Sequence, residues 1–338
     1  MASFADRGGP EELARFRKLT LVTIVATFAL VVIGGVVRVS ESGLGCGAAG
    51  SGTHGWPLCG GRVLPFLDLN AVVEFSHRVA AMLVAALIVL MVWRAVRQLR
   101  EQRWIVRGSI AALVLVLAQA GLGGLTVEHG LAEALVAAHL GLAMLLLGLL
   151  IAIRRAAGAG DPVPAAASGA LRPLTVIAAA LVFATIVAGG YMAGTERVGA
   201  ESAAVDGGAH LACGTEFPSC LGEAFPFGKG RMVDVHLTHR ALMYLAAIAV
   251  LAMVAVATRR GVRSPAFPLA AAILLLQILL GALNVWLGEH AELVVAHLSV
   301  GTLLWVTVAY AAVELFPVPA GERARVPDPR PQASTSTA

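Results

Sequence analysis

The sequence is dominated by eight apolar runs, each long enough to cross a lipid bilayer as a helix. A hydrocarbon core about 30 Å thick needs about 20 helical residues. Only 14% of the residues are charged, against about 25% in soluble proteins. The runs are continuous, which argues against the alternating strands of a membrane β-barrel. We expect an all-α polytopic membrane protein whose spans are residues 19–38, 73–96, 106–127, 132–153, 173–194, 233–258, 266–287 and 292–316.

The basic residues indicate how the chain is oriented. Of the 25 Lys and Arg residues, 18 lie on the side of the two termini and seven on the other side. By the positive-inside rule, both termini are cytoplasmic and the long loops 39–72 and 195–232 face outside. The basic residues form no single patch, so no nucleic-acid partner is expected. The first run lacks an A-x-A cleavage site and an Arg- and Ser-rich transit segment, which favours a retained span in a bacterial cell membrane.

An internal repeat with a shift of about 158 residues divides the chain into two halves. The motif that begins at Gln119 returns at Gln277, and each glutamine precedes a histidine by 20 residues. Gly34-Gly35 likewise returns as Gly189-Gly190. An even number of spans per half predicts two four-helix bundles related by a pseudo-twofold axis along the membrane normal.

The repeat also sets the expected domain boundaries. A cytoplasmic segment, 1–18, precedes the N-terminal bundle, 19–153. A cytoplasmic linker, 154–172, leads to the C-terminal bundle, 173–316. The tail 317–338 is rich in Pro, Ser, Thr and Ala and is expected to be disordered.

Four histidines lie inside predicted spans, at matching depths, two in each half. Histidines within spans are costly and mark functional sites. They are His77, His139, His239 and His297. Each lies four to seven residues past the outer end of its predicted span, or about 6–10 Å into the membrane.

Two imidazoles facing each other inside a four-helix bundle are suited to the axial positions of haem iron. Arg78 and Arg240, each beside a histidine, are candidates to bind the haem propionates. No C-x-x-C-H motif is present, so the haem is not expected to be covalently attached. Hydrogen bonds between helices are the alternative role for these histidines.

One acidic residue distinguishes the two halves. Glu74 lies three residues before His77, on the same helical face, and His236 takes the equivalent place in the second half. A carboxylate beside only one pocket suggests that this pocket carries out chemistry. The alternative is a carboxylate that satisfies free N–H groups at the start of a helix.

All four cysteines lie in the two outside loops. Because the outside is oxidising, we expect one disulfide in each loop, Cys46–Cys59 and Cys213–Cys220. Four free thiols or a metal site are the alternatives.

Three motifs resemble the haem A synthase family, over residues 19–316. They are Ser42-Gly43-Leu44-Gly45-Cys46, Trp56-Pro57-Leu58-Cys59 and Glu74-Phe75-Ser76-His77-Arg78. The histidines at 139, 239 and 297, and Arg240, also fall where that family has them. The stretch between Cys46 and Cys59 is longer than the family's usual spacing.

The resemblance implies an oxidoreductase that converts the C8 methyl group of haem O to the formyl group of haem A by successive hydroxylations, with water lost from a geminal diol. It implies a resident haem b held by His239 and His297, a substrate haem held by His77 and His139, and an important acidic residue at Glu74. Expected partners are haem O, membrane lipid, haem O synthase and an electron donor that no motif identifies. Whether the protein forms a homo-oligomer stays open.

Two other functions remain open from the residues alone. A di-haem electron-transfer protein of the membrane cytochrome b type would use the same histidine pairs. Such proteins usually place their haems on opposite sides of the bilayer, whereas both pairs here lie near the outer face. A transporter with structural histidines would bind no haem, and the broken helices typical of transporters are not evident.

Overall fold

The computed structural model describes residues 9–65, 67–158, 169–195, 208–288 and 290–316. The tail 317–338, most of the linker and several arginines used to orient the chain lie outside these ranges. The described chain is all helical, with no named strand, and its eight long helices are each apolar enough to span a membrane. They are α1 (Pro10–Val39), α2 (Leu69–Gln98), α3 (Arg103–Glu128), α4 (Glu133–Ala156), α6 (Leu171–Gly194), α7 (Arg231–Arg259), α8 (Ala266–Trp286) and α9 (Ala291–Glu314).

All eight predicted spans are confirmed, although several helices extend beyond the predicted bounds. The clearest case is α1, which begins at Pro10 rather than at residue 19. Pro10 is in the first turn of the helix, and Glu11 and Glu12 favour the positive end of the helix dipole. An apolar run indicates the part of a helix that lies in the hydrocarbon core. The helix itself can continue beyond this run, as α1 does at its start.

The outer surface of the bundle suits lipid. Large apolar side chains in the middle of the helices are exposed, for example Leu117 at 62% and Ile248 at 66%. An exposed apolar surface of this kind marks contact with a membrane or a partner. Residues such as Met91, Leu147 and Met253 are fully buried and pack between the helices.

The helices pack as two rings of four that share a central interface. In the first half α1 contacts α2, α2 contacts α3, α3 contacts α4, and α4 returns to α1. The helices α6, α7, α8 and α9 make the corresponding contacts in the second half. The halves meet where α4 packs on α6 and α9, and where α1 packs on α9. The equivalent contacts agree with the sequence repeat, and the pseudo-twofold axis itself stays a prediction.

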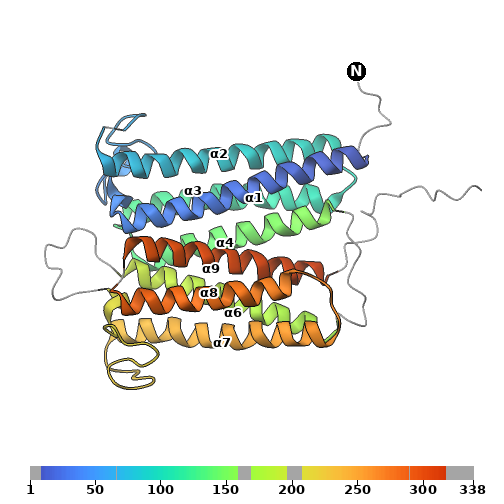
Figure 1. The fold of residues 1–338 in the computed structure, drawn as a ribbon. Helices are drawn as coiled ribbons and strands as arrows, with labels where there is room; N and C mark the ends of the chain where they lie inside the picture. The colour runs from blue at the N-terminus through green and yellow to red at the C-terminus, as the bar shows by residue number, and fades with distance from the viewer. Residues whose placement is uncertain (1–8, 66, 159–168, 196–207, 289, 317–338) are drawn as a thin grey trace, which may run out of the picture.

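This packing places the histidine-bearing helices at opposite corners of each ring. In the first half these helices are α2 and α4, and in the second half α7 and α9. Figure 1 shows the long loop between α1 and α2 and the loop that leads into α7 at the same end of the molecule, away from the start of α1. Both loops therefore lie over the ends of the helices that carry the histidines.

Trp305 on α9 connects the two halves at the centre of the interface. Its indole N–H donates a hydrogen bond to the carbonyl of Met144 on α4 at 2.8 Å. Its ring lies 5.6 Å from that of Phe183 on α6 and close to Gly148, where a Cβ would come within 3.3 Å. One side chain therefore contacts helices from both halves.

We expect Trp305→Phe to lower the free energy of unfolding by about 1 kcal/mol, because it removes this hydrogen bond from a buried site. Thermal unfolding in detergent, followed by circular dichroism, measures the effect. Trp93→Phe is the matched control, because Trp93 is 52% exposed on the lipid-facing surface. Equal melting temperatures for the two variants would contradict the role given to Trp305.

Candidate functional site

The four histidines lie at matched positions in their helices. His77 and His239 each come eight residues after the first residue of their helix, whereas His139 and His297 come six residues after it. At 1.5 Å per residue these positions are about 12 and 9 Å from the outer helix ends. His77 and His239 are further from the helix start than the sequence suggested, because α2 and α7 begin earlier than the predicted spans, whereas His139 and His297 are within one residue of the expected position.

Within each half the two histidines come from helices at opposite corners of the four-helix ring. This arrangement is compatible with the predicted pairing of His77 with His139 and of His239 with His297, and the pairing itself stays a prediction.

Each histidine ring rests on a glycine of the preceding helix. A Cβ atom built on that glycine would come within 3.0–3.2 Å of the histidine Cε1 atom. The pairs are Gly34 with His77, Gly123 with His139, Gly189 with His239, and Gly281 with His297. A methyl group at these positions would force the ring to move by a few tenths of an ångström, so each glycine allows its imidazole to lie close against the preceding helix.

The polar atoms of the imidazoles fit a role as metal ligands. His239 Nδ1 lies 3.0 Å from the carbonyl of Thr185, a contact that places the proton on Nδ1 and leaves Nε2 with a free lone pair. The Nδ1 atoms of His77, His139 and His297 are buried without a hydrogen-bond partner among the described residues, although the three side chains are only half-buried. In these three imidazoles no contact with the described residues fixes Nδ1 as the protonated nitrogen, unlike in His239. Four imidazoles in two pairs therefore fit the axial positions of haem iron.

Two glutamines at equivalent positions of the repeat contact different atoms of their histidines. The Gln119 amide donates to the backbone carbonyl of His139 at 2.8 Å. The Gln277 amide instead lies 3.1 Å from the ring atom Nε2 of His297. The repeat marks both glutamines in the sequence, but not their contacts.

Glu74 lies beneath the first outside loop and is almost fully buried. One carboxylate oxygen accepts a hydrogen bond from the backbone N–H of Cys46 at 2.7 Å. The other oxygen pairs with Arg78, one turn further along α2. The carboxylate therefore bridges the loop and the helix that carries His77.

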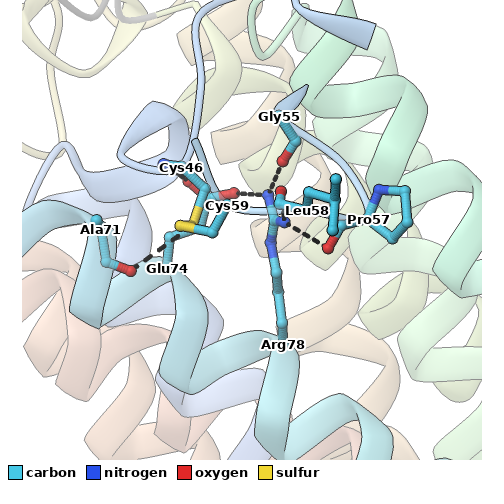
Figure 2. Close-up of polar contacts among 8 residues, drawn as sticks. All are labelled: Cys46, Gly55, Pro57, Leu58, Cys59, Ala71, Glu74 and Arg78. Atoms are coloured by element: carbon cyan, nitrogen blue, oxygen red, sulfur yellow. Dashed lines mark hydrogen bonds and ion pairs between the residues drawn. A yellow bond between two sulfur atoms is a disulfide. The ribbon is translucent and has the colours of Figure 1, made fainter. Parts of the chain in front are cut away.

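Arg78 holds the same loop from below, as Figure 2 shows. Its guanidinium donates to the carbonyls of Gly55 at 2.7 Å, Leu58 at 2.8 Å and Pro57 at 3.3 Å. This contact differs from the propionate contact suggested by the sequence. Propionate binding by Arg78 stays a prediction.

The second half holds its loop with a related set of residues. Arg240 donates to the carbonyls of Ser219 at 2.8 Å and Glu216 at 2.7 Å, and it lies over the ring of Phe217. His236, at the place of Glu74, contacts the carbonyl of Ala209 through Nδ1 at 2.7 Å. The loop anchor is thus shared by both halves, whereas among the described residues the place of Glu74 beneath the loop is taken by His236 in the second half.

Both expected disulfides are present. Cys46 is bonded to Cys59, and Cys213 to Cys220. The long stretch within the first loop is held by Glu128 at the end of α3. Its backbone carbonyl accepts from the N–H of Gly50, and its carboxylate accepts from the N–H of Gly52, both at 3.0 Å. This third anchor was not evident from the sequence, because Glu128 is 76 residues from Gly52.

These features define a class of protein: a multi-pass helical membrane protein with a histidine pair in each half, beneath outer loops closed by disulfides. The sequence profile of the COX15-CtaA family, described as cytochrome oxidase assembly protein, matches residues 17–309. The chain belongs to this family.

Several bacterial relatives carry the name heme A synthase. The chain is 29% identical to that of Alkalihalophilus pseudofirmus over 230 residues, which cover 67% of this chain and 71% of the relative. It is 28% identical to that of Halalkalibacterium halodurans over 234 residues, covering 66% and 71%. It is also 35% identical to that of Bacillus pumilus over a shorter stretch of 147 residues, covering 39% and 45%.

We expect Arg78→Lys to loosen the first outside loop, because an ammonium group keeps the charge beside Glu74 but lacks the planar fork that reaches several carbonyls. Losing one hydrogen bond to a charged group costs about 1.5 kcal/mol or more, which is about tenfold in local opening. Hydrogen exchange of the backbone amides in residues 55–62 measures this opening. Arg97→Lys in the last turn of α2 is the control. Unchanged exchange in the loop would contradict the anchoring role of Arg78.

Proposed function

We propose that the protein is a haem A synthase, which converts haem O to haem A for terminal oxidases. The observation that carries this proposal is the buried Glu74, placed one turn from His77 in a chain of this family. Two histidine pairs provide for two haems, and the carboxylate makes one of the two sites chemically different. The relatives named heme A synthase support the enzyme and lend no support to a di-haem electron-transfer protein.

In this proposal the second half holds a resident haem b through His239 and His297. The contact of His239 with Thr185 supports a permanent ligand role, because it holds the imidazole in the tautomer that binds iron. When bound, haem b supplies one-electron redox chemistry at its iron. Arg240 donates its hydrogen bonds to the loop that covers this half.

The first half receives the substrate, haem O, through His77 and His139. The reaction converts the C8 methyl group of haem O to a hydroxymethyl group and then to a geminal diol, which loses water to leave the formyl group. Each hydroxylation removes two electrons from the substrate carbon. These electrons pass to an external acceptor, or they reduce molecular oxygen together with two further electrons from a separate donor. The two histidines orient the substrate by holding its iron at a fixed place between α2 and α4.

Glu74 serves the oxidation in the first half. Its two oxygens accept hydrogen bonds from Cys46 and Arg78, which hold a negative charge at a fixed place one turn from His77. A fixed carboxylate in a partly apolar site can accept a proton from the substrate alcohol or position water. The same contacts hold the loop, so Glu74 combines a chemical and an anchoring role.

The protein acts in the bacterial plasma membrane, with cytoplasmic termini and both haem sites near the outer face. The support for this orientation is the excess of Lys and Arg on the side of the termini. Haem O synthase supplies the substrate, and a separate donor or acceptor of electrons completes the reaction.

We expect His239→Ala and His297→Ala to remove haem b from the purified protein, because a single remaining imidazole leaves one axial position of the iron open. His77→Ala and His139→Ala are the matched variants from the other half, and they should keep haem b while losing haem A formation. Pigment extraction and optical spectra of the purified variants measure both results. Retention of haem b in both second-half variants would contradict the assignment of the resident haem.

We expect Glu74→Gln to keep haem b and to reduce haem A formation at least about tenfold, or about 1.4 kcal/mol of activation free energy. Glutamine keeps the size of the side chain but removes its charge, so haem O or a hydroxylated product should accumulate. Chromatography of haems extracted after supplying haem O measures the rate. Glu128→Gln is the control, because Glu128 also binds a loop N–H but lies on α3. Wild-type rates in Glu74→Gln would leave Glu74 with the anchoring role alone.

A further inference from the structure

The two repeated glycine pairs each contact both halves of the protein. On α1, a Cβ at Gly34 would lie 3.2 Å from His77 of the same half. A Cβ at the next residue, Gly35, would lie 2.6 Å from Leu298 on α9, in the other half. Successive residues of an α-helix point about 100° apart, so one pair can contact two different neighbours.

The pair on α6 shows the same arrangement in reverse. A Cβ at Gly189 would lie 3.1 Å from His239 of its own half. A Cβ at Gly190 would lie 3.1 Å from Leu140 and 3.3 Å from the Cα atom of Ala137, both on α4 of the other half. The Cα atom belongs to the backbone, so it cannot turn aside as the end of a side chain can.

The residues contacted across the interface adjoin the other two histidines. Leu140 directly follows His139, and Leu298 directly follows His297. Both leucines also pack against the buried hydrophobic core, which limits how far they can turn away. Each glycine pair therefore contacts one histidine of its own half and the neighbour of one histidine of the other half.

We propose that the two glycine pairs position the histidines of both haem sites together, so that the N-terminal half helps to place the resident haem and the C-terminal half helps to place the substrate haem. Gly34 and Gly189 act on their own halves, whereas Gly35 and Gly190 act across the interface. The identity of the haem in each half is taken from the proposed function. The crossed contacts themselves do not depend on it. The four glycines are positioning residues, because they act through the histidines.

A purely structural role for these glycines predicts a different outcome. Glycines that only allow close helix packing would lower stability when replaced, with no preference for either haem site. The crossed arrangement predicts instead that adjacent glycines in one helix affect different haems. Identical Gly→Ala substitutions at neighbouring residues therefore separate the two explanations.

The experiment uses the full-length protein in detergent with four single substitutions. Gly189→Ala and Gly35→Ala should shift the optical and electron paramagnetic resonance spectra of resident haem b and weaken its retention at least about tenfold, equivalent to about 1.4 kcal/mol. Gly190→Ala and Gly34→Ala should leave the haem b spectrum unchanged and lower conversion of supplied haem O by a similar factor. Gly121→Ala on α3 is the control, because a Cβ there meets no atom within 4 Å, and it should change neither property.

A second set of variants tests the contact itself and covers poor folding of a single variant. Leu298→Ala combined with Gly35→Ala removes both atoms that the new methyl group would meet. Leu140→Ala combined with Gly190→Ala removes the Cδ2 atom of Leu140 but leaves the Cα atom of Ala137 at 3.3 Å, so it should restore the property only in part. Restoration of folding or of the affected haem property in these doubles supports the proposal. If the Gly35 and Leu298 double stays as impaired as Gly35→Ala while Leu298→Ala alone behaves normally, the proposed contact is not the cause.

The results distinguish failure of this inference from failure of the proposed function. If both glycines of a pair affect the same haem, or if all four variants behave as Gly121→Ala does, the inference is wrong. If His77→Ala rather than His239→Ala removes the resident haem, the assignment of the halves is wrong. In that case the crossed arrangement predicts that Gly34→Ala and Gly190→Ala shift the resident haem spectrum.

Discussion

The absence of water from the hydrocarbon core of a bilayer governs this structure. Every backbone N–H and C=O group there must find its partner within the protein, so the described spans are helices and irregular backbone is confined to their ends. A site inside such a bundle is built from side chains that reach between helices. The distance between helices then decides where an imidazole can lie, and glycine gives the closest approach. The repeated contact of a glycine with each of the four histidines follows from this constraint.

The outside loops are bonded directly to the helices that carry two of the histidines. The second helix of each half carries both a histidine and an arginine one residue later, and the arginine binds carbonyls of the loop above. Loop carbonyls near a membrane surface have few partners other than water, and a guanidinium satisfies several of them at once. A change in the loop is therefore passed directly to the helix beneath it, close to the histidine.

The two halves have diverged where they hold their loops. Glu74 accepts a hydrogen bond from the loop backbone, whereas His236 contacts a loop carbonyl at the equivalent place. In the first half the carboxylate of Glu74 forms an ion pair with Arg78 on the same helix. In the second half, Arg240 is stacked on Phe217 instead. The repeat thus preserves the positions of the histidines while the surrounding residues differ, which supports the proposal of two haem sites with different tasks.

The sequence by itself determined the eight spans, the repeat of four helices and the pairing of the cysteines, because each depends on local hydrophobicity, on the repeat or on neighbouring residues within one loop. It did not determine the starts of α1, α2 and α7, since each helix begins before its predicted apolar run, at Pro10, after the capping residue Asp68 and at Arg231 respectively. Only the tertiary structure decided that Arg78 and Glu74 meet the first loop, that Glu128 holds its insert, and that Gly190 meets α4 rather than its own half. Such contacts depend on the rotation and spacing of helices far apart in the chain, which side-chain packing sets and local pattern does not.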